Sequence, residues 1–198
     1  MADKQALHEW RAVKARIPGW FAFGRTYDLA VANAADGATF VEVGSWKGRS
    51  AYYMAAKIRD SGKRIRFCCV DHWLGSPEHS DDPDVRSGAL YETFLRNVAD
   101  VRAFLEPMRM SSLEASGRFA DGSCALVLID AGHEYEDVTA DIAAWWPKVA
   151  PGGMLAGDDY DWPGVQRAVG EAFGDAATLL GHSGRRHWRA SISRRPSP

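Results

Sequence analysis

Uninterrupted apolar runs that alternate with helical patterns constrain the fold of this chain more than any other feature. Seven runs read as strands, at residues 39–43, 65–70, 103–110, 125–129, 154–156, 177–181 and 187–193. Helical spacing follows at 48–60, 88–100, 113–119, 135–149 and 164–173. Strands without polar alternation are typical of a sheet that is buried on both faces. We therefore expect an α/β fold with a mostly parallel seven-stranded sheet and helices on both faces.

The remaining segments suggest how the chain is organised. Residues 4–17 and 27–34 carry helical spacing, so residues 1–35 are expected to form an N-terminal helical cap on a single domain of residues 1–193. A long polar stretch at 72–90 is interpreted as a lid or substrate-recognition loop, with a solvated connector as the alternative. Residues 194–198 look like a tail.

Charge and composition exclude several classes of protein. The net charge is −2, and no run of 18 apolar residues or signal peptide is present, so we expect no nucleic-acid partner, no membrane span and a cytoplasmic location. The cysteines are expected to be buried in the core, because they lie in or beside apolar runs and form no CxxC pair: Cys68, Cys69 and Cys124. The arginines near the C-terminus read as the solvated charges of an edge strand: Arg185, Arg186, Arg189, Arg194 and Arg195.

Ligands of parallel α/β sheets bind outside the carboxyl ends of the strands, near the point where the strand order switches. The residues that follow the apolar runs are therefore the candidates for function. They are Glu42 to Gly48, Asp71 to Trp73, Ser111 and Ser112, Asp130 to His133, and Asp158 to Tyr160. Aspartate ends three of these five runs, which points to a site and not only to helix capping.

The turn after the first run distinguishes between three kinds of nucleotide site. A P-loop needs four residues between its glycines, whereas only three separate Gly44 from Gly48. A GxGxxG dinucleotide turn would need glycine where Trp46 stands. The pattern that fits is Glu42, Gly44 and Gly48, which resembles motif I of the class I S-adenosylmethionine-dependent methyltransferases. That resemblance implies a Rossmann-like fold and an acidic residue after the next strand for the ribose hydroxyls, and Asp71 stands there, 27 residues after Gly44.

Three carboxylates follow the fourth and fifth runs. Asp130 ends one and Asp158 and Asp159 end the next, and these strands are neighbours in sheets of this kind. Unpaired buried carboxylates repel one another, and a divalent cation would remove the conflict. Oxygen ligands favour Mg²⁺, Mn²⁺ or Ca²⁺ over Zn²⁺, and the chain has no cysteine–histidine zinc spacing.

Longer blocks extend the resemblance to about residues 18–173. Residues 40–50, 71–79, 126–138 and 147–160 resemble the small-molecule O-methyltransferases related to the macrocin and novobiocin sugar methyltransferases, and more distantly catechol O-methyltransferase. The resemblance implies that Asp130 is both a metal ligand and a candidate base, and that Asp158 and Asp159 complete the metal site. Among the cations that oxygen ligands favour, we expect Mg²⁺. Pockets vary within that group, so the acceptor stays unidentified.

These interpretations define the predicted site. The catalytic candidates are Asp130 and His133, either of which could take a proton from the acceptor. Trp73 is expected to face the adenine or to lie in the core, and Ser111 and Ser112 to bind the adenine edge. The predicted cofactor-binding residues are Glu42, Gly44, Ser45, Gly48, Ser50, Asp71, His72, Trp73, Ser111, Ser112 and Asp130.

The sequence thus predicts an S-adenosylmethionine-dependent, divalent-metal-assisted O-methyltransferase of a small hydroxylated compound, a sugar or a natural product. Three alternatives stay open: a metal-independent N- or O-methyltransferase, an aminopropyl transferase, and a non-catalytic cofactor-binding module. A homodimer is a further expectation, because small members of this group often pair through surface helices.

Overall fold

The computed structural model describes residues 10–182 and 185–191. Its centre is one seven-stranded sheet with the order β3-β2-β1-β4-β5-β7-β6. The strands are β1 Thr39–Val43, β2 Arg66–Asp71, β3 Glu106–Arg109, β4 Cys124–Ile129, β5 Val149–Gly157, β6 Thr178–His182 and β7 Arg185–Ser191. The first five pair in parallel, whereas β7 pairs antiparallel with β5 and β6. The predicted mostly parallel seven-stranded sheet is confirmed.

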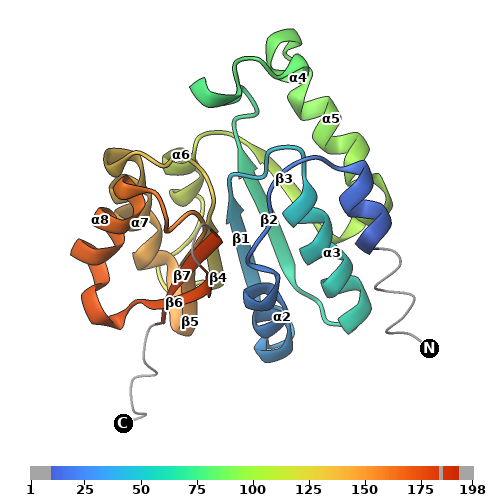
Figure 1. Ribbon diagram of the computed structural model, residues 1–198. Helices are drawn as coiled ribbons and strands as arrows, with labels where there is room; N and C mark the ends of the chain where they lie inside the picture. Colours follow the sequence, from blue (N-terminus) through green and yellow to red (C-terminus); the bar gives the residue numbers. More distant parts are fainter. Residues whose placement is uncertain (1–9, 183–184, 192–198) are drawn as a thin grey trace.

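Helices cover both faces of this sheet (Figure 1). One face carries α2 Gly24–Asn33, α3 Arg49–Ser61 and α5 Leu90–Asn97, and the other carries α6 Ser112–Ser116, α7 Tyr135–Trp145 and α8 Pro163–Phe173. A short α4 Pro83–Ser87 and four 3₁₀ turns complete the set: η1 Pro77–His79, η2 Ala99–Phe104, η3 Trp146–Lys148 and η4 Gly174–Ala176. Residues 10–16 are also helical.

Each central strand contributes side chains to two hydrophobic cores, because its side chains alternate between the two faces of the sheet. On β4, Leu126 and Leu128 pack on the α3 side, and Val127 and Ile129 pack on the α7 side. This two-sided burial explains why the strands read as continuous apolar runs. The three cysteines are buried, as predicted.

Several predicted boundaries were wrong. The strand expected over 103–110 spans only Glu106–Arg109, because Ala99–Phe104 forms the 3₁₀ turn η2. The helix expected over 135–149 ends at Trp145, because Pro147 has no N–H to continue the helical ladder, and Val149 already belongs to β5. Strand β5 consequently spans nine residues and not only 154–156. The predictions for helical residues 4–9, strand residues 192–193 and the tail 194–198 lie outside the described residues.

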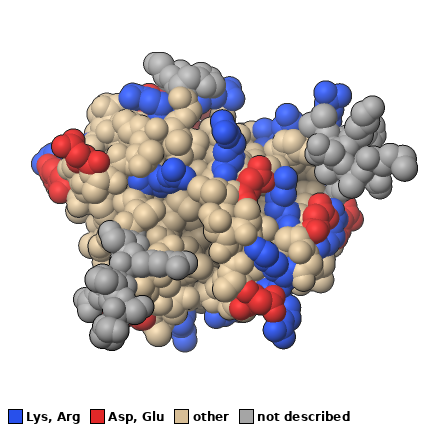
Figure 2. Space-filling model, turned by 90° about the horizontal axis from the view of Figure 1, so that it is seen from below, with Lys and Arg blue, Asp and Glu red and all other residues tan. Residues whose placement is uncertain are grey.

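The outer surface shows how charge is distributed. Figure 2 shows lysine, arginine and acidic side chains interspersed on the face seen from below, without one basic patch on that face. Within the described ranges, no helix is both long enough and apolar enough to cross a bilayer.

The strand order reverses between β1 and β4, and this reversal fixes where a site can form. From β1 the chain moves outward to β2 and β3, then returns to β4 on the other side of β1 and continues to β5. Ligands of open α/β sheets bind at the carboxyl ends of strands beside such a switch. The backbone bonds from Asp130 N to Val43 O and from Asp158 N to Ile129 O set both aspartates at that edge.

Candidate functional site

The turn after β1 needs glycine at both predicted positions. Gly44 has φ +89°, and a Cβ atom there would lie 1.9 Å from the carbonyl oxygen of Asp130. Gly48 also has φ +89°, and its Cβ would lie 2.8 Å from Val98 Cγ1. Any side chain at Gly44 would collide with backbone and not with a movable group. The glycine turn is therefore packed directly against the end of β4.

Glu42 supports this turn from inside the protein. Its carboxylate is fully buried and accepts hydrogen bonds from Tyr27 Oη at 2.5 Å and from Ser45 Oγ at 2.8 Å. Burial raises the pKa of Glu42 to about 7, against the opposing hydrogen bonds from Tyr27, Ser45 and Ser50. Two predicted cofactor residues, Ser45 and Ser50, thus hydrogen-bond to a third, Glu42, beneath the turn.

Asp71 shapes the same turn from the end of β2. Its Oδ2 accepts from the backbone N–H groups of Ser45 at 3.0 Å and Trp46 at 2.9 Å, and its Oδ1 accepts from Trp73 N at 2.7 Å. A carboxylate has about four acceptor sites, so these three bonds leave one for a ligand hydroxyl. Beside it, His72 Nδ1 accepts from Leu74 N at 3.0 Å, and its side chain is half exposed.

The position of Trp73 gives no support to the prediction that it contacts the cofactor. Trp73 is 1% exposed and packs against Tyr91 and Phe94 at centroid distances of 4.8 and 4.7 Å. Its Nε1 donates to Trp46 O at 2.9 Å. The indole belongs to the core, the other option that the sequence left open.

Ser111 and Ser112 also have partners within the protein. Ser111 forms a capping box with Glu114 at the start of α6. Ser112 Oγ donates to Asp141 Oδ1 at 2.5 Å and accepts from Trp145 Nε1 at 2.9 Å. Both hydroxyls stabilise α6 and its contact with α7, so the geometry gives no support to an adenine-binding role for them.

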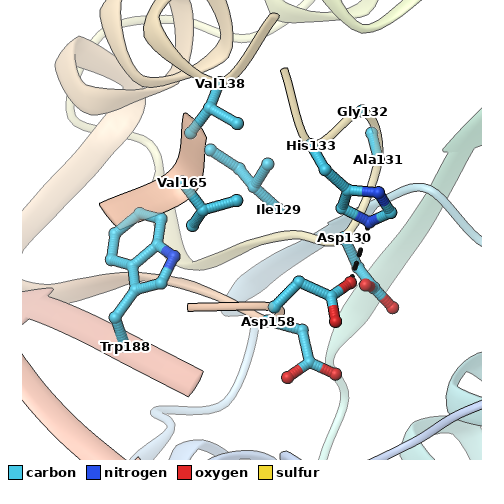
Figure 3. Close-up of a pocket in the computed structure, with 10 residues that line it drawn as sticks. Ile129, Asp130, Ala131, Gly132, His133, Val138, Asp158, Val165 and Trp188 are labelled. Carbon is cyan, nitrogen blue, oxygen red and sulfur yellow. Dashed lines mark ion pairs between the residues drawn. The ribbon is translucent and has the colours of Figure 1, made fainter. Parts of the chain in front are cut away.

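The carboxylates that follow β4 and β5 share one small pocket. Asp130, Asp158 and Asp159 line it together with His133, and its volume is about 10 Å³. That is close to the space of one water molecule, too small for a nucleoside or a sugar. Figure 3 shows Asp130 and His133 on one side of this pocket, and Trp188 and Val165 on the opposite side.

The charges in this pocket perturb one another strongly. Burial, and then the charges of Asp158 and Asp159, raise the pKa of Asp130 well above its usual range. Burial and the neighbouring Asp159 raise the pKa of Asp158 to about 7. Proximity of like charges in a poorly solvated place is thus the dominant electrostatic feature of the site.

His133 is held between two carboxylates. Its Nε2 lies 2.8 Å from Asp159 Oδ2, and this hydrogen bond raises the pKa of His133 although burial opposes it. Its Nδ1 is buried without a hydrogen-bond partner, 3.5 Å from Glu78 Oε1. The ring stacks on Trp162, with centroids 4.8 Å apart and planes at 20°. Nε2 is therefore directed at Asp159.

No preformed metal-ligand set is present in the described part of the chain, where no group of three or more His, Cys, Asp or Glu side chains is positioned to hold an ion. The Asp159 carboxylate is instead engaged by His133. The oxygen donors that the sequence predicted are nevertheless brought to one pocket.

The stretch predicted as a lid, 72–90, is attached to the glycine turn. The ammonium of the nearly buried Lys47 lies 2.7 Å from Asp82 Oδ2 and 2.8 Å from Asp84 Oδ2. The His79 ring lies 4.1 Å from the Trp46 ring. The sequence analysis assigned no role to Lys47, Glu78 or Trp162. The long, polar composition of 72–90, which contains Glu78, was the signal that this stretch reaches the site.

Comparisons with known proteins agree with this arrangement. A family model described as a methyltransferase domain matches residues 41–160. The 8-demethyl-8-(2,3-dimethoxy-alpha-L-rhamnosyl)-tetracenomycin-C 4'-O-methyltransferase of Streptomyces olivaceus is 29% identical over 147 residues, which cover 65% of this chain and 55% of that protein. The match thus spans little more than half the length of this curated relative.

Solved structures show the same fold at low sequence identity. The O-methyltransferase TomG from Streptomyces achromogenes, in complex with SAM, has a TM-score of 0.64 at 15% identity, with 95% of this chain and 89% of that chain covered. The O-methyltransferase NovP has a TM-score of 0.62 at 17% identity, covering 86% and 79%. CalS11, a TDP-rhamnose 3'-O-methyltransferase, has a TM-score of 0.58 at 20% identity, covering 84% and 76%.

Proposed function

This chain belongs to the methyltransferase family whose domain model spans residues 41–160, and from that premise we propose that it transfers a methyl group from S-adenosylmethionine to a hydroxyl of a small acceptor. Relatives of the same fold methylate sugar-bearing compounds, so a sugar or another hydroxylated natural product is the proposed acceptor.

One observation carries the proposal. The carbonyl of Asp130, at the end of β4, packs against Gly44 of the glycine turn, and the Asp130 carboxylate shares a pocket with Asp158 and Asp159. A turn suited to a nucleoside donor and a cluster of acidic groups therefore meet at the switch in strand order. Juxtaposing two reactants in this way can contribute roughly 7–11 kcal/mol to lowering a barrier.

The chemistry of the three carboxylates suits a hard divalent cation, although among the described residues they are not arranged around a common point. Asp130, Asp158 and Asp159 offer only oxygen atoms, and their mutual repulsion would be relieved by a positive ion. We propose that these residues would hold Mg²⁺, which when bound would supply a Lewis acid that lowers the pKa of an acceptor hydroxyl. The ion pair between Asp159 and His133 favours a second candidate, transfer without a metal.

The residues of the chain position the donor and accept the proton of the acceptor. Asp71 and Glu42 hold the glycine turn in shape for the donor. The acceptor oxygen forms its bond to the methyl carbon as the bond from that carbon to sulfur breaks, and its proton passes to a base of the pocket. Asp130 is the proposed base, because its carboxylate lines the pocket whereas Nε2 of His133 is engaged by Asp159.

The test is methyl transfer from S-[methyl-³H]adenosylmethionine to a panel of glycosides, phenols and alcohols. The assay is run after EDTA treatment and again with added Mg²⁺. Turnover that depends on Mg²⁺ is expected. Turnover that survives chelation would reject the metal and retain the methyltransferase, and S-adenosylmethionine binding without transfer to any acceptor would reject the enzyme.

A further inference from the structure

Trp162 presents an exposed indole directly beside the carboxylate pocket. It is 46% exposed, although one side of its ring system stacks on His133, which lines the pocket. Aromatic side chains commonly line ligand pockets, so an indole beside the carboxylates is a candidate ligand contact.

The backbone holds this indole in a fixed place. Trp162 N donates to Asp159 O at 2.9 Å, and Trp162 O accepts from Gln166 N at 2.9 Å. Two residues on, a Cβ atom at Gly164 would lie 2.4 Å from His133 O, so the start of α8 packs against the backbone of His133. Trp162 is therefore a rigid surface for stacking, which lowers the entropic cost of binding a ring.

A second exposed aromatic side chain lies against turn η1. Trp20 is 73% exposed and its ring lies 6.0 Å from His79, which in turn stacks near Trp46. The preceding residue, Glu78, approaches His133. Turn η1 therefore contacts Trp20 through His79 and approaches His133, the stacking partner of Trp162, through Glu78.

The charges around this mouth are unfavourable for an anion. Glu78 and Asp159 are about 40% exposed there, at 42% and 39% of their side chains. Lys47 is shared by two aspartates, and Arg186 is paired with Asp161 at 2.7 Å. Lys47 and Arg186 are therefore already paired, and the exposed carboxylates of Glu78 and Asp159 would repel a diphosphate.

We infer, on the premise of the proposed function, that Trp162 positions the acceptor by stacking on an uncharged hydroxylated ring, and that a sugar joined to a neutral aglycone is accepted in preference to the same sugar on a nucleoside diphosphate. The stacked ring brings a hydroxyl toward the neighbouring carboxylates. A glycosyl-transfer reaction must then supply the substrate, and methylation follows it.

The first test compares Trp162→Ala with Trp162→Phe, using 4-nitrophenyl α-L-rhamnopyranoside as the acceptor. We expect the alanine variant to raise the acceptor KM about tenfold, the size of one lost stacking contact, with kcat and the Kd of S-adenosylmethionine within a few-fold. Phenylalanine should restore most of the affinity, and Leu179→Ala, on the edge strand β6, should leave KM unchanged. An unchanged KM in Trp162→Ala would overturn the inference.

The second test compares that glycoside with TDP-rhamnose at equal concentration in the wild-type enzyme. We expect a kcat/KM at least tenfold higher for the glycoside, and a smaller ratio in Glu78→Gln, which removes one negative charge from the mouth. A higher kcat/KM for TDP-rhamnose, or methyl transfer to non-sugar alcohols only, would overturn the inference while the proposed function stands. Failure of transfer to every acceptor would instead reject the proposed function, and the inference with it.

Discussion

At the scale of single residues, Glu42 is the group with the clearest consequence for stability. It lies buried with only hydroxyl partners, and its pKa is raised from 4.5 to about 7. Between those two values the folded protein binds a proton that the unfolded chain has lost, so this group makes stability fall as pH rises through that window. The loss corresponds to roughly 3 kcal/mol at complete ionisation.

We therefore predict that Glu42→Gln flattens the pH dependence of stability, because glutamine keeps the shape of the side chain without titrating. The free energy of unfolding, measured by urea denaturation at pH 5 and pH 8, should fall less in the variant than in the wild type. Asp141 and Asp158 contribute in the same direction in both proteins, so they cancel in the comparison. Equal slopes would show that Glu42 does not titrate in this range.

A pair of substitutions separates the pocket from the glycine turn. Asp158→Asn should abolish Mg²⁺-stimulated turnover and leave the Kd of S-adenosylmethionine within a few-fold, since Asp158 does not contact the turn. Asp71→Ala should do the reverse, because it removes the acceptor of three backbone N–H groups and leaves them unpaired. Calorimetric titration of the donor into each variant checks this, and equal loss of donor affinity in both would contradict it.

Residue roles were predictable where backbone geometry demanded one amino acid. Gly44 and Gly48 could be identified because a strand-to-helix turn that approaches another backbone tolerates no Cβ. Ser111, Ser112 and Trp73 could not, since a hydroxyl or an indole at a strand end serves a helix cap or a core as well as a ligand. Trp162 escaped notice for the same reason: nothing in the sequence separates an exposed tryptophan from the buried ones.

At the scale of elements, the contact between the glycine turn and the stretch 72–90 is the least expected feature. Lys47 is nearly buried and carries two carboxylate partners, which keep the pKa values of Asp82 and Asp84 below their usual range. Helix α4 has no buried residue of its own, so this ion pair is a main attachment of the stretch.

We predict that Lys47→Met releases the part of 72–88 that follows the buried Trp73, without unfolding the sheet. Removing the ammonium leaves two carboxylates to repel each other, so hydrogen exchange in this stretch should accelerate about tenfold or more. Peptides from β4 and α7 should keep their protection. Lys148→Met, which breaks the exposed-partner ion pair with Asp121 at 2.6 Å, is the matched control. Unchanged exchange in 72–88 would show that other contacts hold it.

The positions of the helices and strands were predictable because the central strands are buried on both faces and therefore appear in the sequence as continuous apolar runs. The helix after Asp130 was extended too far, since the apolar residues around Val149 fit the end of a helix and the start of a strand equally well. Only pairing with β4, a contact distant in sequence, decides between them.

At the scale of the whole molecule, the two cores share one sheet and should unfold together. We predict that Leu128→Ala, which creates a cavity in the α3-side core, costs about 2–5 kcal/mol. Far-ultraviolet circular dichroism and tryptophan fluorescence should still give coincident urea transitions. The exposed Leu179→Ala should cost about 0.5 kcal/mol or less. Separated transitions would show that the cores are independent units.

The fold as a whole was predictable, and the shape of the site was not. A parallel sheet with a switch in order follows from the order of apolar and helical segments. The engagement of Asp159 by His133, however, depends on the path of the loop 158–162, in which Asp159 adopts φ +53°, and no local pattern encodes that path.

The antiparallel strand β7 inserts between β5 and β6, and its Trp188 lines the pocket where a Cβ at Gly157 would lie 2.6 Å from the indole. A wall of the pocket thus comes from a segment translated long after the glycine turn. On the ribosome, a nascent chain that still lacks β7 would already contain the three aspartates, but the side of the pocket formed by Trp188 would be missing. Assembly of the working centre is consequently a late event of biosynthesis.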